Sequence, residues 1–131
     1  MVRLLHRLRD DDGAADAIQV TVCFPLVMLV IVSIIQVAAW CFAVNTAQTA
    51  TDHAAWAARA ADGTADGGRV AAEQVVHQLG NRSLRDPHIM VDRTATQVVV
   101  TITALGPHFV PFWPEQIRAV AAAPLEVETH A

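Results

Sequence analysis

The chain contains a long apolar stretch, residues 20–42, in which no side chain is charged. The conventionally polar residues in this stretch are Thr21, Ser33 and Gln36. A helix of this length would extend about 34 Å, at about 1.5 Å per residue, and would cross a hydrocarbon core of about 30 Å. We therefore predict a membrane-spanning helix here, because uncharged apolar runs longer than roughly 18 residues seldom form the core of a soluble protein.

A regular series of small residues continues the helical pattern beyond the apolar stretch. Its alanines alternate between spacings of four and three positions, so they line one face of a helix, and Ser33 and Gln36 extend that face back into the span. The alanines are Ala43, Ala47, Ala50, Ala54, Ala57 and Ala61. Because small residues let a second backbone approach closely, this face packs either against neighbouring subunits or against the chain's own C-terminal part. Gln36 would then be either a hydrogen-bonding contact between helices or a polar residue buried in a bundle.

The C-terminal half changes from helical to strand periodicity. A cluster of Asp and Gly at residues 62–68 predicts the end of the long helix. The spacing of apolar residues then predicts a short second helix at residues 69–79. Alternating and β-branched residues at 88–93 and 97–104 predict a hairpin. We also expect a third strand at residues 117–122, because a lone hairpin is only marginally stable.

The predicted fold is therefore α+β. It has one long N-terminal transmembrane helix that extends outside the membrane, a short second helix, and a small antiparallel β-sheet of two or three strands packed on the outer part of the long helix. We divide the chain into a cytoplasmic leader (1–13), a long helix (14–62) and a small extracytoplasmic α+β domain (63–131). The second strand is expected to point Val98, Val100, Ile102 and Ala104 toward one face.

A proline-broken loop at residues 106–114 follows the second predicted strand. It carries three aromatic residues, Phe109, Phe112 and Trp113, between its prolines. Prolines at this density exclude regular structure. The aromatic side chains either form a lid on the small core or contact a membrane or a partner protein.

The distribution of arginine predicts the orientation of the span. The formal net charge is −4, and all 9 basic residues are arginine. Arg3, Arg7 and Arg9 precede the span, and the next arginine along the chain is Arg59. Because cytoplasmic flanks are rich in Lys and Arg, the N-terminus is expected in the cytoplasm and the C-terminal domain outside the cell membrane. The basic residues form no stripe, so we do not expect nucleic acid as a partner.

The sequence shows no spacing that is typical of a catalytic or metal site. The 6 histidines are dispersed, and no His or Cys pair stands three or four positions apart. No Gly-rich loop carries the Lys and Ser or Thr that bind phosphate. We therefore expect no metal, no cofactor, no small-molecule substrate and no enzymatic activity.

The order of features around residues 13–30 resembles the TadE-like family of tight-adherence (Flp) pilus proteins, which are similar to type IVb prepilins. The matching stretch has Gly13 followed by small residues, Gln19, and Pro25 at the start of the apolar run; the Ala-rich continuation and tail resemble actinobacterial members. The resemblance implies that a prepilin peptidase cuts between Gly13 and Ala14. Gln19 departs from the family, whose members carry a Glu here that pairs with the N-terminal amine of a neighbouring subunit. Glutamine accepts a hydrogen bond but brings no charge to that amine.

Two functions are compatible with this pattern. The first is a TadE-like minor pilin or pilus-assembly component, a non-enzymatic single-pass protein of the bacterial cell membrane. It would act by helix packing in a pilus or secretion machine, with other Tad pilins or assembly proteins as partners. The alternative is a membrane-anchored extracytoplasmic binding module that is never processed.

Overall fold

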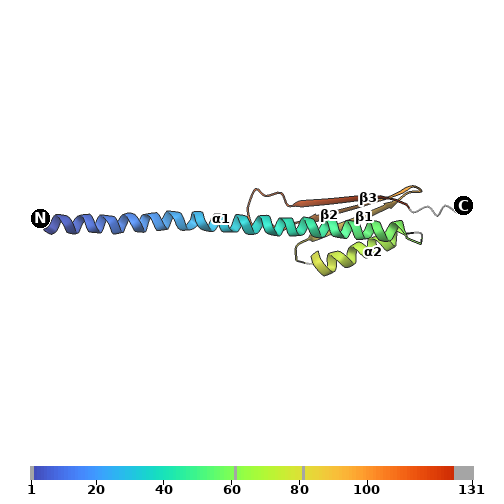
Figure 1. Cartoon of the computed structure of the whole chain (residues 1–131), viewed down its shortest axis with the longest axis horizontal. Coiled ribbons are helices and arrows are strands. Elements are labelled where there is room, and N and C mark those ends of the chain that lie inside the picture. The colour runs from blue at the N-terminus through green and yellow to red at the C-terminus, as the bar shows by residue number, and fades with distance from the viewer. Residues whose placement is uncertain (1, 61, 81, 126–131) are drawn as a thin grey trace. The chain divides into compact units, whose positions relative to one another are not determined.

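The structure is a computed structural model of the chain, and it describes residues 2–60, 62–80 and 82–125. For residues 2–12, 14 and 15 it describes the backbone alone. The elements in chain order are α1 (Val2–Arg59), α2 (Ala65–Val75), the short π-helix η1 (Val76–Gly80), β1 (Arg85–Arg93), β2 (Gln97–Leu105) and β3 (Gln116–Pro124) (Figure 1). The predicted α+β fold is confirmed, with a long apolar N-terminal helix, a short second helix and an antiparallel sheet of three strands.

The chain divides into two compact units, residues 1–35 and residues 36–131, and α1 contributes to both. This division differs from the predicted domain boundary after residue 62, because the C-terminal part of α1 supplies core residues to the second unit. Helix α1 also begins at Val2 rather than at residue 14, so Gly13 lies inside it. A glycine inside a helix costs only about 1 kcal/mol relative to alanine, which a long helix tolerates.

The first unit exposes its apolar side chains. Helix α1 contains a segment, Asp16–Arg59, with an 18-residue window of mean hydropathy 2.6, and none of this window is buried. Phe24, Leu29 and Ile34 are among the large apolar residues that are exposed here. By its length and composition, α1 is therefore a candidate membrane span near the N-terminus.

The hydroxyl groups of the exposed apolar run bond within the helix. The Thr21 hydroxyl donates to the carbonyl oxygen of Ala17 at 2.8 Å, and the Ser33 hydroxyl donates to that of Leu29 at 2.8 Å. Such bonds to the preceding turn let a hydroxyl lie in apolar surroundings without an external partner. Pro25 lies inside α1 and does not end it.

The second unit has its core between the sheet and the C-terminal part of α1. The sheet order is β1-β2-β3, and both neighbouring pairs are antiparallel. Across the sheet Val100 pairs with Val91 on one side and with Ala121 on the other. The predicted inner face of β2 is confirmed, because the four side chains expected there are buried: Val98, Val100, Ile102 and Ala104.

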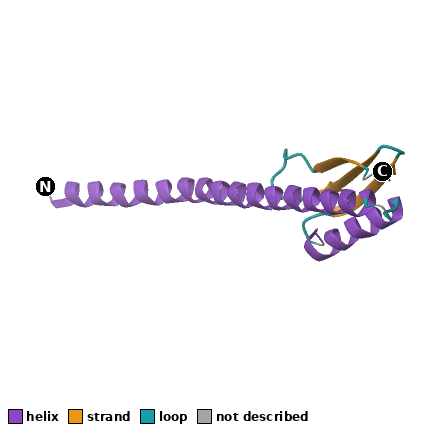
Figure 2. Ribbon diagram, turned by 45° about the vertical axis from the view of Figure 1, so that its right-hand side comes forward, coloured by secondary structure: helices purple, strands orange, loops and turns teal. Residues whose placement is uncertain are grey.

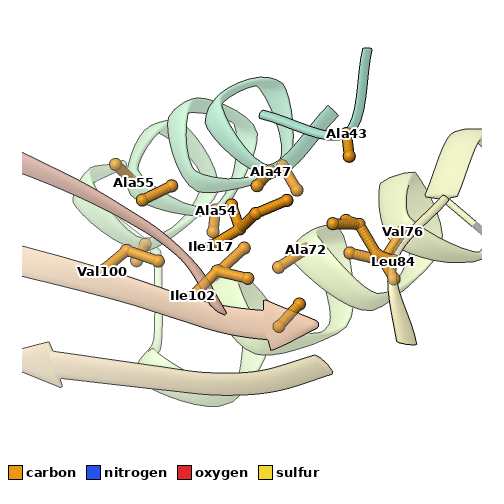
Figure 3. Packing of buried hydrophobic residues seen from close by; sticks show 14 of the residues in the cluster. Ala43, Ala47, Ala54, Ala55, Ala72, Val76, Leu84, Val100, Ile102 and Ile117 are labelled. Atoms are coloured by element: carbon orange, nitrogen blue, oxygen red, sulfur yellow. The ribbon is translucent and has the colours of Figure 1, made fainter. Parts of the chain in front are cut away.

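Alanines of α1 allow the helix to pack closely on this core. Ala43, Ala47, Ala50 and Ala54 have no exposed surface, and they belong to the same cluster as Ile102 and the α2 residue Ala72 (Figure 3). Figure 2 shows the sheet and α2 beside the C-terminal part of α1.

Gly68 marks a close approach of α2 to α1. A Cβ atom at this glycine would lie 2.8 Å from the Cβ of Ala58 and 2.9 Å from the carbonyl oxygen of Ala54. These separations are shorter than van der Waals contact, so a larger residue would force the two helices apart. Small residues on both helices therefore set the spacing between them.

Helix α2 begins earlier than the apolar spacing predicts. It starts at Ala65 instead of residue 69, because Thr64 caps it: the Thr64 hydroxyl accepts a hydrogen bond from the Gly67 N–H at 2.9 Å. Thr is a favourable N-cap residue. The sequence predicted a turn for the whole Asp and Gly cluster, but part of this cluster forms the first helical turn of α2.

The outer strands are longer than predicted, and each contains a proline. Strand β1 begins at Arg85 and includes Pro87, where the pairing with β2 is irregular and Asp86 adopts a φ of 49°. Strand β3 continues to Pro124. Proline is tolerated in these strands because both lie at the edge of the sheet, where one side needs no ladder hydrogen bond.

We predict that Ala50→Leu destabilises the domain. Ala50 has no exposed surface, and overpacking of a full core costs about 1–3 kcal/mol. The measurement is thermal unfolding of the full chain in detergent micelles, followed by near-ultraviolet circular dichroism. The control is Gln48→Leu, which introduces the same side chain at an exposed position of the same helix. Equal melting temperatures for the two variants would contradict the packing described here.

Candidate functional site

The connection between β2 and β3, residues 106–115, lies against α1, and we call it the docked loop; its hydrogen bonds to α1 come from the side chain of Gln36. The side chain of Gln36 is 0% exposed. Its Nε2 donates to the carbonyl oxygen of Pro107 at 2.8 Å, and its Oε1 accepts from the N–H of Phe109 at 2.8 Å. Both ends of the amide therefore bind backbone groups of the docked loop.

This arrangement gives Gln36 a role that neither sequence-based alternative described. A glutamine in an apolar helix was expected to contact another helix or to be buried in a bundle. Instead it binds a segment of its own chain more than 70 positions later in the sequence. Two hydrogen bonds to backbone groups also meet the need of a buried amide for partners.

An aromatic pair forms the second contact between the docked loop and α1. The rings of Trp40 and Trp113 meet edge to face, with centroids 6.2 Å apart and planes at 73°. Gly106 lies beneath Trp40: a Cβ there would be 3.0 Å from the Trp40 ring and 2.8 Å from Ile117 Cδ1. Glycine at this position thus lets the start of the loop pass under the indole.

Polar contacts close the base of the docked loop. The N–H of Gly106 donates to the carbonyl oxygen of Glu115 at 2.7 Å, and Arg85 Nη2 donates to the carbonyl oxygen of Gly106 at 3.2 Å. His108 Nδ1 lies 3.3 Å from Glu115 Oε1. These contacts hold the two ends of the loop together, so its middle projects as a defined unit.

The three aromatic residues of the docked loop divide into two groups. Trp113 is half-buried against Trp40, which is the position expected of a lid. Phe109 is 60% exposed and Phe112 is 101% exposed. Phe112 also has a φ of 78°, a region that side chains other than glycine rarely adopt. The lid therefore involves one ring, while two phenylalanine rings project away from the core.

The indole nitrogen of Trp113 adds to the free-energy cost of the conformation of the docked loop. It is buried, and no hydrogen-bond partner is found for it among the residues that the structure describes. An unpaired buried donor costs about 1–3 kcal/mol. Unfavourable features of this kind, together with the backbone of Phe112, are typical of segments that are shaped for contact rather than for stability.

The predicted small-residue face is divided between the two units. From Ala43 to Ala54 it packs against the chain's own domain, which is one of the two alternatives that the sequence left open. Further along, Ala58 is buried and Ala57 only half-buried, because a straight helix drifts by about 20° per seven residues from a strict heptad pattern. Ala61 lies outside the described residues. In the first unit, Ser33 is half-buried.

The residues of the predicted processing site lie on the N-terminal part of α1. Gly13 is exposed on α1, and nothing lies within 4 Å of a Cβ built on it. The side chain of Ala14 lies outside the described part of the chain. Gln19 is exposed, six positions before Pro25.

Histidine and acidic residues gather near a shallow groove between α2 and β1. Arg69 forms ion pairs there with Glu73 at 2.6 Å and with Asp66 at 3.7 Å, while His88 lies 3.4 Å from Asp86. His77 also lines the groove. Across the described ranges, no group of three or more His, Cys, Asp or Glu residues could hold a metal ion. These exposed charges form a solvated surface with ordinary ion pairs.

No known family model, curated protein or solved structure matches this chain. The docking of the loop by Gln36 was not predictable from local sequence, because it joins residues far apart in the chain. A polar residue at the end of an apolar run and a later aromatic loop were each visible. Only the fold brings them into contact.

We predict that Gln36→Leu releases the docked loop. The substitution removes both partners of the loop backbone, and each unpaired buried group costs about 1–3 kcal/mol. The Phe109 amide should therefore exchange hydrogen at least about tenfold faster, measured by mass spectrometry of the full chain in micelles. Ser33→Ala serves as the control, because the Ser33 hydroxyl bonds only to Leu29 of its own helix. Unchanged exchange at Phe109 in the Gln36 variant would show that this side chain does not hold the loop.

Proposed function

We propose that this protein is a TadE-like minor pilin or pilus-assembly component, a non-enzymatic single-pass membrane protein that acts by helix packing. The observation that carries the proposal is the exposure of the apolar window of α1, none of which is buried in the chain's own fold. Such a surface requires lipid or other apolar helices around it. A prepilin-like protein uses the same surface in both settings, first in the membrane and then in an assembly.

The continuity of α1 supports this proposal. The helix that carries the apolar window also supplies alanines to the core of the second unit, with no break between them. Removal of the helix from the membrane would therefore not require a linker to rearrange. The alanines from Ala43 to Ala54 are already occupied by the domain core, so contacts with neighbouring subunits fall to the residues before Gln36.

Gln19 favours a minor role over a role as the main pilus subunit. A charged residue at this place would offset the ammonium group of a neighbouring subunit within an apolar bundle. Glutamine does not supply that charge, so it stabilises stacking of many identical copies less well. A subunit that starts or ends an assembly, or assists it, needs fewer such contacts.

We predict that a prepilin peptidase cuts the chain between Gly13 and Ala14. The measurement is the intact mass and N-terminal sequence of the protein from a host membrane with and without a co-expressed prepilin peptidase. The expected product begins at Ala14, and Gly13→Leu should block its formation because it changes the residue before the cut. A chain that stays intact in every sample would instead favour the unprocessed, membrane-anchored binding module.

We further predict that the second unit lies outside the cell membrane. Cys23 and Cys41 are free and exposed, so both are first replaced by Ser. A single cysteine introduced by His53→Cys, at an exposed position of α1, should react with a membrane-impermeant maleimide in intact cells. The matched variant Asp16→Cys, at an exposed position that lies after the predicted cut and leaves the arginines unchanged, should react only after lysis. The reverse pattern would refute the orientation inferred from the arginines.

A further inference from the structure

The two exposed phenylalanines of the docked loop form an apolar projection without a partner in the described part of the chain. Phe112 is fully exposed, and Phe109 is 60% exposed three positions before it. Phenylalanine side chains are rarely displayed to water in this way unless they contact another apolar phase or a partner. The backbone of Phe112, with φ at 78°, directs this ring out at a cost in conformational energy.

The position of the docked loop along α1 is fixed by Gln36. Hydrogen bonds of 2.8 Å join Gln36 to Pro107 and Phe109, so this part of the loop lies at the level of that helical turn. In the sequence of the same continuous helix, Gln36 directly follows Ile35, an exposed residue of the apolar run. The loop is thus attached where α1 changes from exposed on all sides to packed on the domain along one side, while Val37 and Phe42 remain exposed on the other.

The length of the fully exposed part of α1 suits a membrane boundary near Gln36. Residues 18–35 are exposed except for half-buried Ser33, and at about 1.5 Å per residue this stretch is about 27 Å long, close to the roughly 30 Å of a hydrocarbon core. The sequence predicted a span that continues to Phe42. That boundary would draw the His108 and Glu115 pair of the docked loop toward hydrocarbon, where ionisable groups are costly. A boundary at Gln36 leaves this pair in the headgroup layer.

We propose that the docked loop is an interfacial anchor, in which Phe109 and Phe112 insert into the bilayer interface beside the end of the span. The inference rests on the membrane insertion proposed above, but not on pilus assembly or on the direction of the span. Aromatic rings are favoured at this depth, and burial of the Phe112 ring offsets the strain of its backbone. Gln36 then links the span and the anchor at a fixed depth.

The proposed anchor would restrict the movement of the second unit relative to the membrane. A single span leaves a domain free to tilt with the helix and to shift in depth. A second contact from a loop bound to the same helix restricts both motions, so the domain stays at one height above the bilayer. The occupant is the lipid interface itself rather than a second protein, because the loop is attached at the end of the lipid-exposed run.

The test measures the depth of single nitroxide labels on the full chain in phosphatidylcholine and phosphatidylglycerol vesicles. Cys23 and Cys41 are replaced by Ser, and a label is placed by Phe109→Cys or Phe112→Cys, so that each variant keeps the other ring. Controls are Leu29→Cys, near the middle of the exposed apolar run, and Val120→Cys, on an exposed position of β3. Accessibility is compared between oxygen, which concentrates in lipid, and a water-soluble nickel chelate.

The expected result is that both loop labels show an oxygen-to-chelate accessibility ratio several-fold above that of Val120→Cys and below that of Leu29→Cys. Loop labels as accessible to the chelate as Val120→Cys, with Leu29→Cys in lipid, would overturn the anchor and leave the span intact. Chelate access at Leu29→Cys would overturn the span itself, and with it the proposed function.

A second copy of the chain is the competing occupant, and the same labels detect it. Contact with another protein would shield the loop labels from both oxygen and the chelate. That shielding would increase as the ratio of protein to lipid is raised, whereas insertion into the interface would not depend on the ratio. Shielding that follows the protein concentration would therefore replace the lipid interface with a protein partner.

Discussion

Close packing on a helix face made of alanine is the constraint on which the second unit depends. The sheet is small, with strands of nine residues each, and it buries only one face. The largest fully buried side chains of the second unit are Ile102, Val98 and Val100 of β2 together with Gln36 and Thr51 of α1. Because the alanines of α1 let the backbone of the helix approach these residues, small side chains are enough to build a thin core.

The type of each helix and strand could be predicted from the periodicity of apolar residues. The residues at which the elements begin and end depend on tertiary contacts, which the periodicity does not show. Alternation in β2 identified the inner face, and the apolar run identified the long helix. The start of α2 was placed too late because Asp66, Gly67 and Gly68 favour a turn locally. In the structure the Thr64 cap and the tight fit of Gly68 under Ala58 favour a helix. Tertiary contact thus decided between two local preferences.

The contacts of the candidate site were even less predictable from the sequence. A polar residue in an apolar helix and a loop with three aromatic residues are both visible in the sequence, but their meeting is not. The amide of Gln36 is matched to two backbone groups whose positions depend on the register of β2 and β3 and on Gly106. A side chain expected to join separate helices therefore joins two parts of one chain, and its hydrogen-bonding capacity is used within the fold.

The prolines of the outer strands have a consequence for crowded copies of this protein. A sheet of three strands has two open edges, and such edges tend to pair with the edges of other molecules. Pro87 in β1 and Pro124 in β3 each remove a backbone donor near one end of an edge strand. Sheets of adjacent molecules then fuse less readily into a continuous ribbon. At high local density, the prolines would therefore keep the sheets of neighbouring molecules from joining edge to edge.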